Sequence, residues 1–277
     1  MGRLLKDQTL YTSGVDAHGD VNTPDLVRIL FSQLSDPMLL SQDHDMSLPP
    51  IAVARNKRLL NKTDGGLAII ADVEIFDEEA AKRYGGFSPA FTTGRALNAD
   101  EVEIPDVQIL YDPLQFSDEE ISELIESAGP NAHFEGRERK LKAAHPQAIL
   151  IVNYVSLVVL NAMLGEAAKG TFKLVFPKLR DLLRRKRGMG IDAKAQLHLR
   201  AGGPHGDFMV IIDLAPDQIE WLGREAHTLE SALAYVRSVV GRLRIERVAI
   251  RPTSAPPYWD LVHFVEDNGL VHVLSGE

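Results

Sequence analysis

The sequence contains no cysteine among its 277 residues. Disulfide bonds, a thiol nucleophile and a zinc site with cysteine ligands are therefore excluded, and the composition is compatible with a reducing compartment. The N-terminal residues also lack the continuous apolar segment of a secretory signal. We therefore expect a cytoplasmic protein.

The sequence also has fewer positively than negatively charged residues. The chain has 30 lysines and arginines against 39 aspartates and glutamates, which gives a formal net charge of -9. This balance argues against a general nucleic-acid binder, so no nucleic-acid partner is expected. Hydrophobic residues make up 45% of the chain, enough to bury a core, and the length suits one large domain or two ordinary ones.

Residues 8–115 are predicted to be rich in strands. Residues 67–76, "LAIIADVEIF", are apolar and β-branched, and they follow the turn signal "KTDGG". Residues 102–113, "VEIPDVQILYDP", form a second apolar run with alternation, which ends at Asp112 and Pro113. Both patterns are typical of strands bounded by turns.

Two helices are predicted in the same part of the chain. In residues 23–34, Thr23 suits the N-cap and Pro24 suits the first helical position, and apolar residues then repeat on one face. In residues 117–129, Ser117 and Glu120 have the spacing of a capping box, and a glycine ends the helix. A polar segment over residues 130–147 then predicts a linker between two domains.

The apolar run over residues 148–165 has two interpretations. It is 18 residues long and uncharged, which is close to the length of a membrane-spanning helix. Asn153, Ser156 and Asn161 interrupt it, so we predict a helix buried by the protein and keep the membrane span as an alternative. The basic cluster "RRKR" at 184–187 would be the cytoplasmic flank of a span, or otherwise a solvated helix face.

From Ala193 onward the pattern changes to mixed strands and helix. Residues 195–201, 207–215, 245–253 and 269–274 are predicted as strands, and residues 228–243 as a helix. The glycine-rich "AGGPHGD" lacks the Lys-Ser/Thr of a phosphate loop and is predicted to be a hairpin turn. The domain prediction is therefore 1–129, a linker over 130–147, and 148–277.

Two short segments carry residues suited to hydrolysis. "LLSQDHDMSLPPIAVA" contains His44, and "YGGFSPAFTTG" places Ser88 behind two glycines. A serine hydrolase needs a hydroxyl, a base that takes its proton, and a third group that orients the base. The alternative is a surface histidine and an ordinary Ser-Pro turn, and "GGFSPAF" is not the G-x-S-x-G motif of α/β-hydrolases.

The order of these segments resembles a known family. "GVDAHGDVNTPDLVRILF", "LLSQDHDMSLPPIA", "DGGLAIIADVEIFDEEAAKRYGGFSPAF" and "DVQILYDP" follow one another as the corresponding pieces do in the caudoviral prohead (capsid maturation) serine protease family. The resemblance includes the XkdF-like branch, which shares the herpesvirus assemblin fold, and it covers roughly the first 115 residues. It implies an α+β protein whose N-terminal part is a mostly antiparallel β-barrel with flanking helices. A helix-rich linker and a smaller α+β C-terminal domain would follow.

The resemblance also implies a catalytic site. By position, His44 matches the family's catalytic histidine, Ser88 its nucleophile and Asp106 its acidic third member, while Arg95 is a weak candidate for stabilising the oxyanion. No cofactor is expected. Three departures bear on activity: the acid at 106 is Asp where the family has Glu, Gln108 replaces a serine, and Pro89 lacks the N–H that could serve an oxyanion.

A metal site would use some of the same residues. Potential ligands lie in two short segments: Asp16, His18, Asp20, Asp43, His44 and Asp45. Their spacing matches no zinc signature such as His-Glu-x-x-His, and Asp-rich loops are commonly turns, so no metal is expected.

Three functional hypotheses follow. The first is a serine endopeptidase of prohead-protease type, acting on a protein substrate and fused to an α+β domain that binds a protein partner, in bacterial signalling or anti-phage defence; we expect a homo-oligomer. The second is a non-catalytic interaction protein on the same barrel. The third is a membrane-associated effector that works through residues 148–187.

Overall fold

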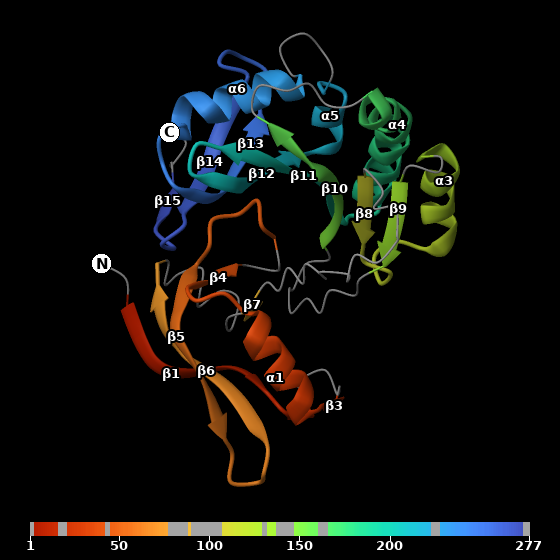
Figure 1. Ribbon diagram of the computed structural model, residues 1–277. Helices are drawn as coiled ribbons and strands as arrows, with labels where there is room; N and C mark the ends of the chain where they lie inside the picture. Colours follow the sequence, from red (N-terminus) through yellow and green to blue (C-terminus); the bar gives the residue numbers. More distant parts are fainter. Residues whose placement is uncertain are drawn as a thin grey trace. The chain divides into compact units, whose positions relative to one another are not determined.

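The computed structural model describes residues 3–15, 21–41, 45–76, 88–89, 107–128, 132–136, 147–159, 166–222 and 228–273, with backbone only for 88–89, 154–159 and 166–172. By its internal contacts the chain forms two compact units (Figure 1). Unit 1 comprises Met1–Ala99 with Lys140–Lys142, and unit 2 comprises Asp100–Arg139 with Ala143–Glu277.

Unit 1 is built on an antiparallel five-stranded sheet in the order β1-β6-β5-β4-β7. Its elements are β1 (Arg3–Thr12), β2 (Gly14–Val15), β3 (Val21–Asn22), α1 (Pro24–Gln33), β4 (Met38–Ser41), β5 (Ala52–Asn61), β6 (Leu67–Ile75) and β7 (Ser88–Pro89). Strands β1 and β7 form the two edges, and no closed barrel is present among the residues that the structure describes.

Helix α1 confirms the predicted start. The Thr23 hydroxyl accepts a hydrogen bond from the backbone N–H of Leu26 at 3.2 Å, as an N-cap does. The buried Val27 packs against Leu67 and Ile69 of β6. Figure 1 shows α1 beside the sheet of unit 1. A short stretch of local sequence thus determines both where this helix begins and which face it buries.

Two irregularities in the sheet of unit 1 are joined by one carboxylate. Asp7 on β1 and Asn56 on β5 both have positive φ, and the register shifts at each. Asp72 lies on β6 between them; its Oδ1 accepts from the Asp7 backbone N–H at 3.2 Å and its Oδ2 from the Asn56 side chain at 3.1 Å. One strand therefore fixes the bulges of both its neighbours.

Unit 2 contains a mixed eight-stranded sheet in the order β15-β14-β13-β12-β11-β10-β8-β9. Its elements are β8 (Val107–Tyr111), α3 (Asp118–Ala128), β9 (Ala132–Gly136), β10 (Gln147–Val159), α4 (Glu166–Gly188), β11 (Asp192–Gly203), β12 (Gly206–Leu214), α5 (Pro216–Ile219), α6 (Leu229–Val240), β13 (Ile245–Pro252), β14 (Trp259–Glu266) and β15 (Val271–Val273). Three parallel pairs, β8–β9, β10–β11 and β12–β13, each enclose helix in the connection, as parallel pairing requires.

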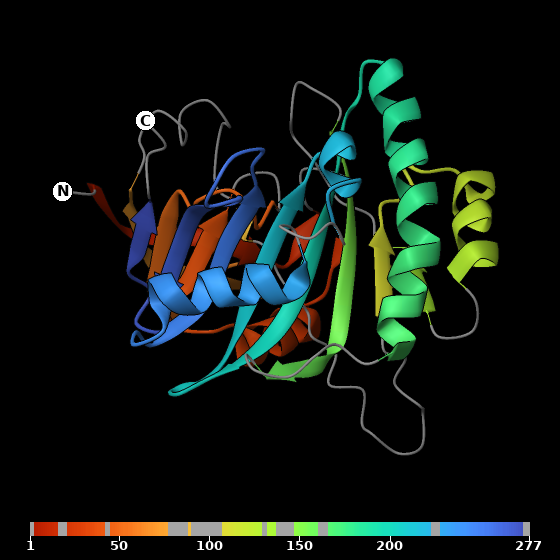
Figure 2. The same ribbon diagram turned by 90° about the horizontal axis from the view of Figure 1, so that it is seen from above.

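One face of this sheet carries the core of unit 2. Buried side chains from α3, α4, α5 and α6 pack with alternate residues of the strands, among them Leu179, Val236, Leu197 and Ile212. Figure 2 shows α3 and α4 side by side and α6 lying along the sheet. Because the helices of the three connections cover the same face, the opposite face of the sheet is built from the alternate residues of each strand.

The prediction of a buried helix over residues 148–165 is wrong. Residues 147–159 form β10, which pairs parallel with β11 and antiparallel with β8. A central strand buried on both faces is a continuous apolar run rather than an alternating one, so its periodicity does not distinguish it from a buried helix. The β-branched residues, such as Ile149, Ile151 and Val152, are the signal that favoured a strand.

The basic cluster at 184–187 is a set of ion pairs at the end of α4. Arg184 lies 2.9 Å from Asp217, Arg185 lies 3.0 Å from Glu123, and the buried Lys186 lies 2.7 Å from Glu120. The predicted solvated face is therefore wrong for Lys186. Among the described residues, no helix is both long enough and apolar enough to cross a membrane.

Other sequence predictions for this part of the chain are confirmed or refined. The Ser117–Glu120 capping box forms, with hydrogen bonds of 2.8 and 3.3 Å. The hairpin turn of "AGGPHGD" joins β11 to β12, with Gly206 at a φ of 127° that glycine tolerates. Unit 2 is larger than unit 1, whereas the C-terminal domain was predicted to be the smaller one. Unit 2 includes β8 and α3, and it also includes β9, which lies in the segment predicted as a linker.

Candidate functional site

The candidate nucleophile lies on an edge strand of unit 1. Ser88 is the first residue of β7, which pairs antiparallel with β4 so that Ser88 faces Ser41 and Pro89 faces Leu40. A base and a nucleophile of one site must lie within about hydrogen-bond reach, so Ser88 and His44 are expected on adjacent strands or strand ends. Ser88 lies beside the end of β4, and His44 follows that end by three residues. Residues 42–44 themselves lie outside the described residues.

The segment after His44 is fixed by a buried carboxylate. Asp45 has no exposed surface, and its Oδ1 accepts hydrogen bonds from the backbone N–H of Ser47 at 2.9 Å and from the Ser47 hydroxyl at 2.7 Å. This is the local Asx geometry that makes Asp frequent in turns. The chain is thus held on both sides of residues 42–44, by the strand β4 and by this turn.

The other predicted members of the site fall outside the described residues. Asp106 immediately precedes Val107, the first residue of β8 in unit 2, and Arg95 lies in the undescribed segment 90–106. Two other acids near the predicted site are described: Asp45, which binds Ser47, and Glu74 on β6. Its neighbours Val73 and Ile75 belong to the core, so Glu74 occupies the opposite face of the sheet.

Ser41 is a residue that the sequence reasoning missed. It is 1% exposed, and its Oγ has no hydrogen-bond partner among the residues that the structure describes. Its neighbour Leu40 belongs to the core, so Ser41 occupies the same face of the sheet as Glu74. The only signal in the sequence was a serine at the end of the apolar run "PMLLS", which is too common to single out.

The described residues do not test the metal-site hypothesis. Five of its six residues, Asp16, His18, Asp20, Asp43 and His44, lie outside them, and Asp45 binds Ser47. Within the described ranges, no three His, Asp or Glu side chains are grouped so that they could hold a metal ion.

The second face of the sheet in unit 2 carries buried and half-buried polar side chains beside apolar ones such as Ile149 and Ile151, and no signal in the sequence indicated this. Its described members include Gln108, Asn153, Lys194, Gln196, His198, Asp213, Arg247 and His263. Two contacts join members of this set: the Asn153 side-chain amide donates to Gln108 Oε1 at 3.4 Å, and His198 Nε2 lies 3.1 Å from Gln196 Oε1. Gln108 also donates to Glu135 at 2.7 Å. The segment "AKAQLHLRA" is predicted only as a strand, and the structure shows that its alternating polar residues Lys194, Gln196 and His198 are buried.

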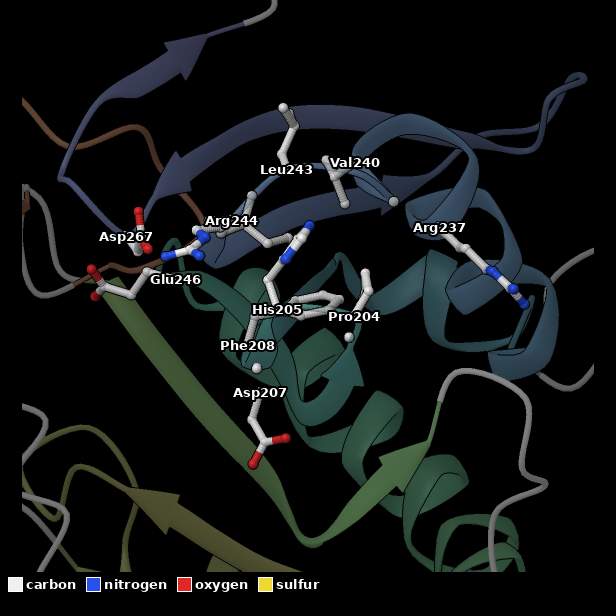
Figure 3. A pocket seen from close by; sticks show the side chains of 14 residues that line it. Pro204, His205, Asp207, Phe208, Arg237, Val240, Leu243, Arg244, Glu246 and Asp267 are labelled. Atoms are coloured by element: carbon white, nitrogen blue, oxygen red, sulfur yellow. The ribbon is translucent and has the colours of Figure 1, made fainter.

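A small cavity opens at one end of the same sheet. It measures about 250 Å³ and lies between the β11–β12 hairpin and the end of α6. In Figure 3, Phe208 and Val240 line its middle, while Arg244, Glu246 and Asp267 gather at one end. Protein atoms around its carboxyl raise the pKa of Glu246, and the Arg247 guanidinium opposes this shift. The cavity is below the size typical of a ligand site, roughly 300 Å³ and more.

Comparisons with protein-family models, with curated proteins and with solved structures found no match to this chain. The candidate site is therefore described from the residues of this chain alone. These are Ser88 opposite Ser41 on paired strands, and the fixed turn of Asp45 and Ser47 directly after His44.

Proposed function

We propose that the chain is a serine endopeptidase of prohead-protease type, with Ser88 as nucleophile and His44 as general base. The observation that carries this proposal is the register of β4 and β7, which sets Ser88 opposite the strand end that leads to His44. Three residues of extended chain span at most ~11 Å, so covalent geometry keeps His44 in the neighbourhood of Ser88. The antiparallel sheet of unit 1 is of the kind from which the barrel of the resembling family is built.

In the proposed mechanism, His44 takes the proton of the Ser88 hydroxyl as its oxygen attacks the carbonyl carbon of a peptide bond. The tetrahedral intermediate collapses when His44 gives that proton to the leaving amine, and an acyl-enzyme remains. Water, deprotonated by the same histidine, then attacks the ester and releases Ser88. Asp106 would hold the imidazole in the required tautomer and stabilise the imidazolium, and Arg95 would stand near the oxyanion.

The origin of the acid distinguishes two versions of this site. Asp106 lies outside the described residues, and the family resemblance alone assigns it as the acid. The alternative acids nearest in sequence are Asp43, Asp45 and Glu74, and Glu74 lies on the same sheet face as Ser41. We propose Asp106 as the acid, on the family resemblance.

Unit 2 would supply the interaction part of the protein. Its sheet and helices form a separate core, and we propose that it binds a protein partner in the cytoplasm, in bacterial signalling or anti-phage defence, in a homo-oligomer. The substrate would be a protein segment.

The proposal is tested by treating the full-length chain with an alkyl fluorophosphonate and mapping the labelled residue. Wild type should be labelled at Ser88, and Ser88→Ala should remove the label. Asp106→Asn should lower the turnover of a cleaved peptide by on the order of 10⁴, the size of the comparable loss in a well-studied triad. The double variant should be little worse than Ser88→Ala, because members of one catalytic unit are not additive.

The alternative is a non-catalytic interaction protein on the same sheet. It is favoured by Pro89, which follows Ser88 in β7 and offers no N–H to an oxyanion. Absence of any label on folded wild-type protein would favour this alternative. Near wild-type activity of Asp106→Asn would instead keep the enzyme, and the acid would then be sought among Asp43, Asp45 and Glu74.

A further inference from the structure

The cavity beside the β11–β12 hairpin is built by three segments of unit 2. They are the hairpin turn, the end of α6 with the start of β13, and the turn between β14 and β15. Backbone pairing ties the second and third together, since Ile245 pairs with Glu266 and the Asp267 N–H donates to the Arg244 carbonyl at 3.1 Å. The cavity is therefore held by regular structure, which positions side chains more precisely than long loops do.

The lining of this cavity is divided by polarity. Phe208 and Val240 are buried and form its apolar middle. Arg244, Glu246 and Asp267 stand at one end (Figure 3). A molecule that matches this lining has charges of both signs at one end and an apolar group at the other.

The three charged side chains stand at the same end without being paired. Within the described ranges, Arg244, Glu246 and Asp267 form neither an ion pair nor a side-chain hydrogen bond. Asp207 also lines the cavity but lies 2.7 Å from Arg200, so its charge is compensated. A ligand with a single charge would be attracted by one sign of charge at that end and repelled by the other, whereas a ligand with both charges is attracted by both.

Glu246 lacks a cation that fully compensates its charge. Burial of its carboxyl raises the pKa of Glu246, and the Arg247 guanidinium opposes this shift only in part. A ligand ammonium beside this carboxylate would stabilise its ionised form. The acids of the cavity therefore favour a ligand that brings a positive charge of its own.

The volume of the cavity limits this ligand to a small molecule. The cavity measures about 250 Å³, and a water molecule occupies about 30 Å³ in the liquid, so the space equals that of roughly eight waters. This suits a single amino acid and is too small for a nucleotide. An α-amino acid carries its ammonium and its carboxylate on the same carbon atom, so its charges and its side chain are divided in the same way as the lining of the cavity.

We propose that this cavity binds a free α-amino acid with an apolar side chain. The ammonium lies between Glu246 and Asp267, the carboxylate faces the Arg244 guanidinium, and the side chain packs on Phe208 and Val240. A residue inside a peptide lacks both charges, which favours the free amino acid over a protein segment. This inference goes beyond the proposed function and does not depend on it, because every residue involved belongs to unit 2.

Isothermal titration calorimetry of the full-length chain with L-leucine tests the proposal. We expect a dissociation constant on the order of 0.1 mM, as the small number of ligand atoms permits. Three related compounds each lack one feature: N-acetyl-L-leucine lacks the positive charge, isoamylamine lacks the negative charge and glycine lacks the apolar side chain. Each should bind at least about tenfold more weakly than L-leucine.

Variants of the cavity give the second part of the test. Arg244→Ala and Glu246→Gln should each weaken the binding of L-leucine about ten- to a hundredfold. Arg242→Ala is the matched control, because Arg242 is also exposed and lies two residues before Arg244 but does not line the cavity. Its affinity should stay within about twofold of wild type. Melting temperatures show whether each variant is folded.

Four results would overturn the proposal. Isoamylamine that binds as well as L-leucine would make the cavity a site for cations alone, and N-acetyl-L-leucine that does so would make it a site for anions. Absence of binding of L-leucine, L-methionine and L-phenylalanine at millimolar concentrations would remove the site. Unchanged affinity in both cavity variants would place the ligand elsewhere. If a variant unfolds, the comparison of ligands on wild type decides, and labelling of Ser88 by a fluorophosphonate tests the proposed function separately.

Discussion

Single carboxylates hold the irregular parts of unit 1 in place, and Asp45 is the most buried of them. Replacing it by alanine would leave the Ser47 N–H and hydroxyl without their acceptor inside the protein. We expect Asp45→Ala to lower the free energy of unfolding by about 2 kcal/mol. Ser47→Ala, which keeps the backbone hydrogen bond, should cost roughly half as much. Urea unfolding of the two variants tests this, and equal costs would contradict it.

Asp72 predicts a dependence of stability on pH. Hydrogen bonds from the Asn56 side chain and from the Asp7 N–H lower the pKa of Asp72, and the Arg58 guanidinium adds to the effect. A carboxyl whose pKa is lowered by folding stabilises the fold above its unfolded pKa of about 3.9, and this contribution is lost as the pH falls through the folded value. Asp72→Asn should therefore melt below wild type at pH about 7, and the difference should shrink toward pH about 3. A difference independent of pH would show that only geometry matters here.

At the scale of elements, Glu120 joins two helices. Its Oε2 accepts the Ser117 N–H in the capping box of α3 and lies 2.7 Å from Nζ of the buried Lys186 on α4. Glu120→Gln keeps a capping acceptor but leaves a buried ammonium unpaired, so we expect a loss of about 2 kcal/mol. Glu123 pairs with Arg185 between the same helices in an exposed position, and Glu123→Gln should cost less than about 0.5 kcal/mol. Chemical denaturation of both variants gives the comparison, and similar losses would refute it.

Local signals were sufficient for elements whose ends are chemically marked. Thr23 and Ser117 placed two helix starts, and the glycines near 203 placed a hairpin, because caps and turns depend on a few adjacent residues. Strand β10 was not predictable in the same way, because its type depends on β8 and β11, which are distant in sequence. The polar face of unit 2 has the same cause: whether His198 meets water or protein is decided by tertiary packing.

The candidate site likewise has parts that the sequence predicts and parts that depend on tertiary structure. The sequence order predicted that Ser88 lies near a strand end close to His44, and the structure describes one half of that pair. Ser41 could not be predicted, because cross-strand register depends on how β4 and β7 align. The roles of Asp106 and Arg95 remain predictions from the resemblance.

At the scale of the whole molecule, the two units have separate cores, so unit 2 is expected to fold without unit 1. A chain of residues 100–277 should unfold in one cooperative step, with a melting temperature within about 5 °C of a transition of the full-length protein. Circular dichroism in the near and far ultraviolet measures both tertiary packing and secondary structure. Retained helix without near-ultraviolet signal would show that the core needs the rest of the chain.

Strand β10 also has a consequence for the speed of folding. It is the sole hydrogen-bonded link between the β8–β9 pair and the strands β11 to β15 in the described sheet, and its parallel partner β11 is reached only after α4 has crossed over. This pairing has to close a long loop, and the entropy cost of closing it comes before the stabilising contacts form. We therefore expect the pairing of β10 with β11 to be a late and slow step of folding. Until that step, the two portions of the sheet would collapse separately and expose β10 as an unpaired apolar edge. The interval before β10 is enclosed is therefore when a newly made chain is most exposed to aggregation.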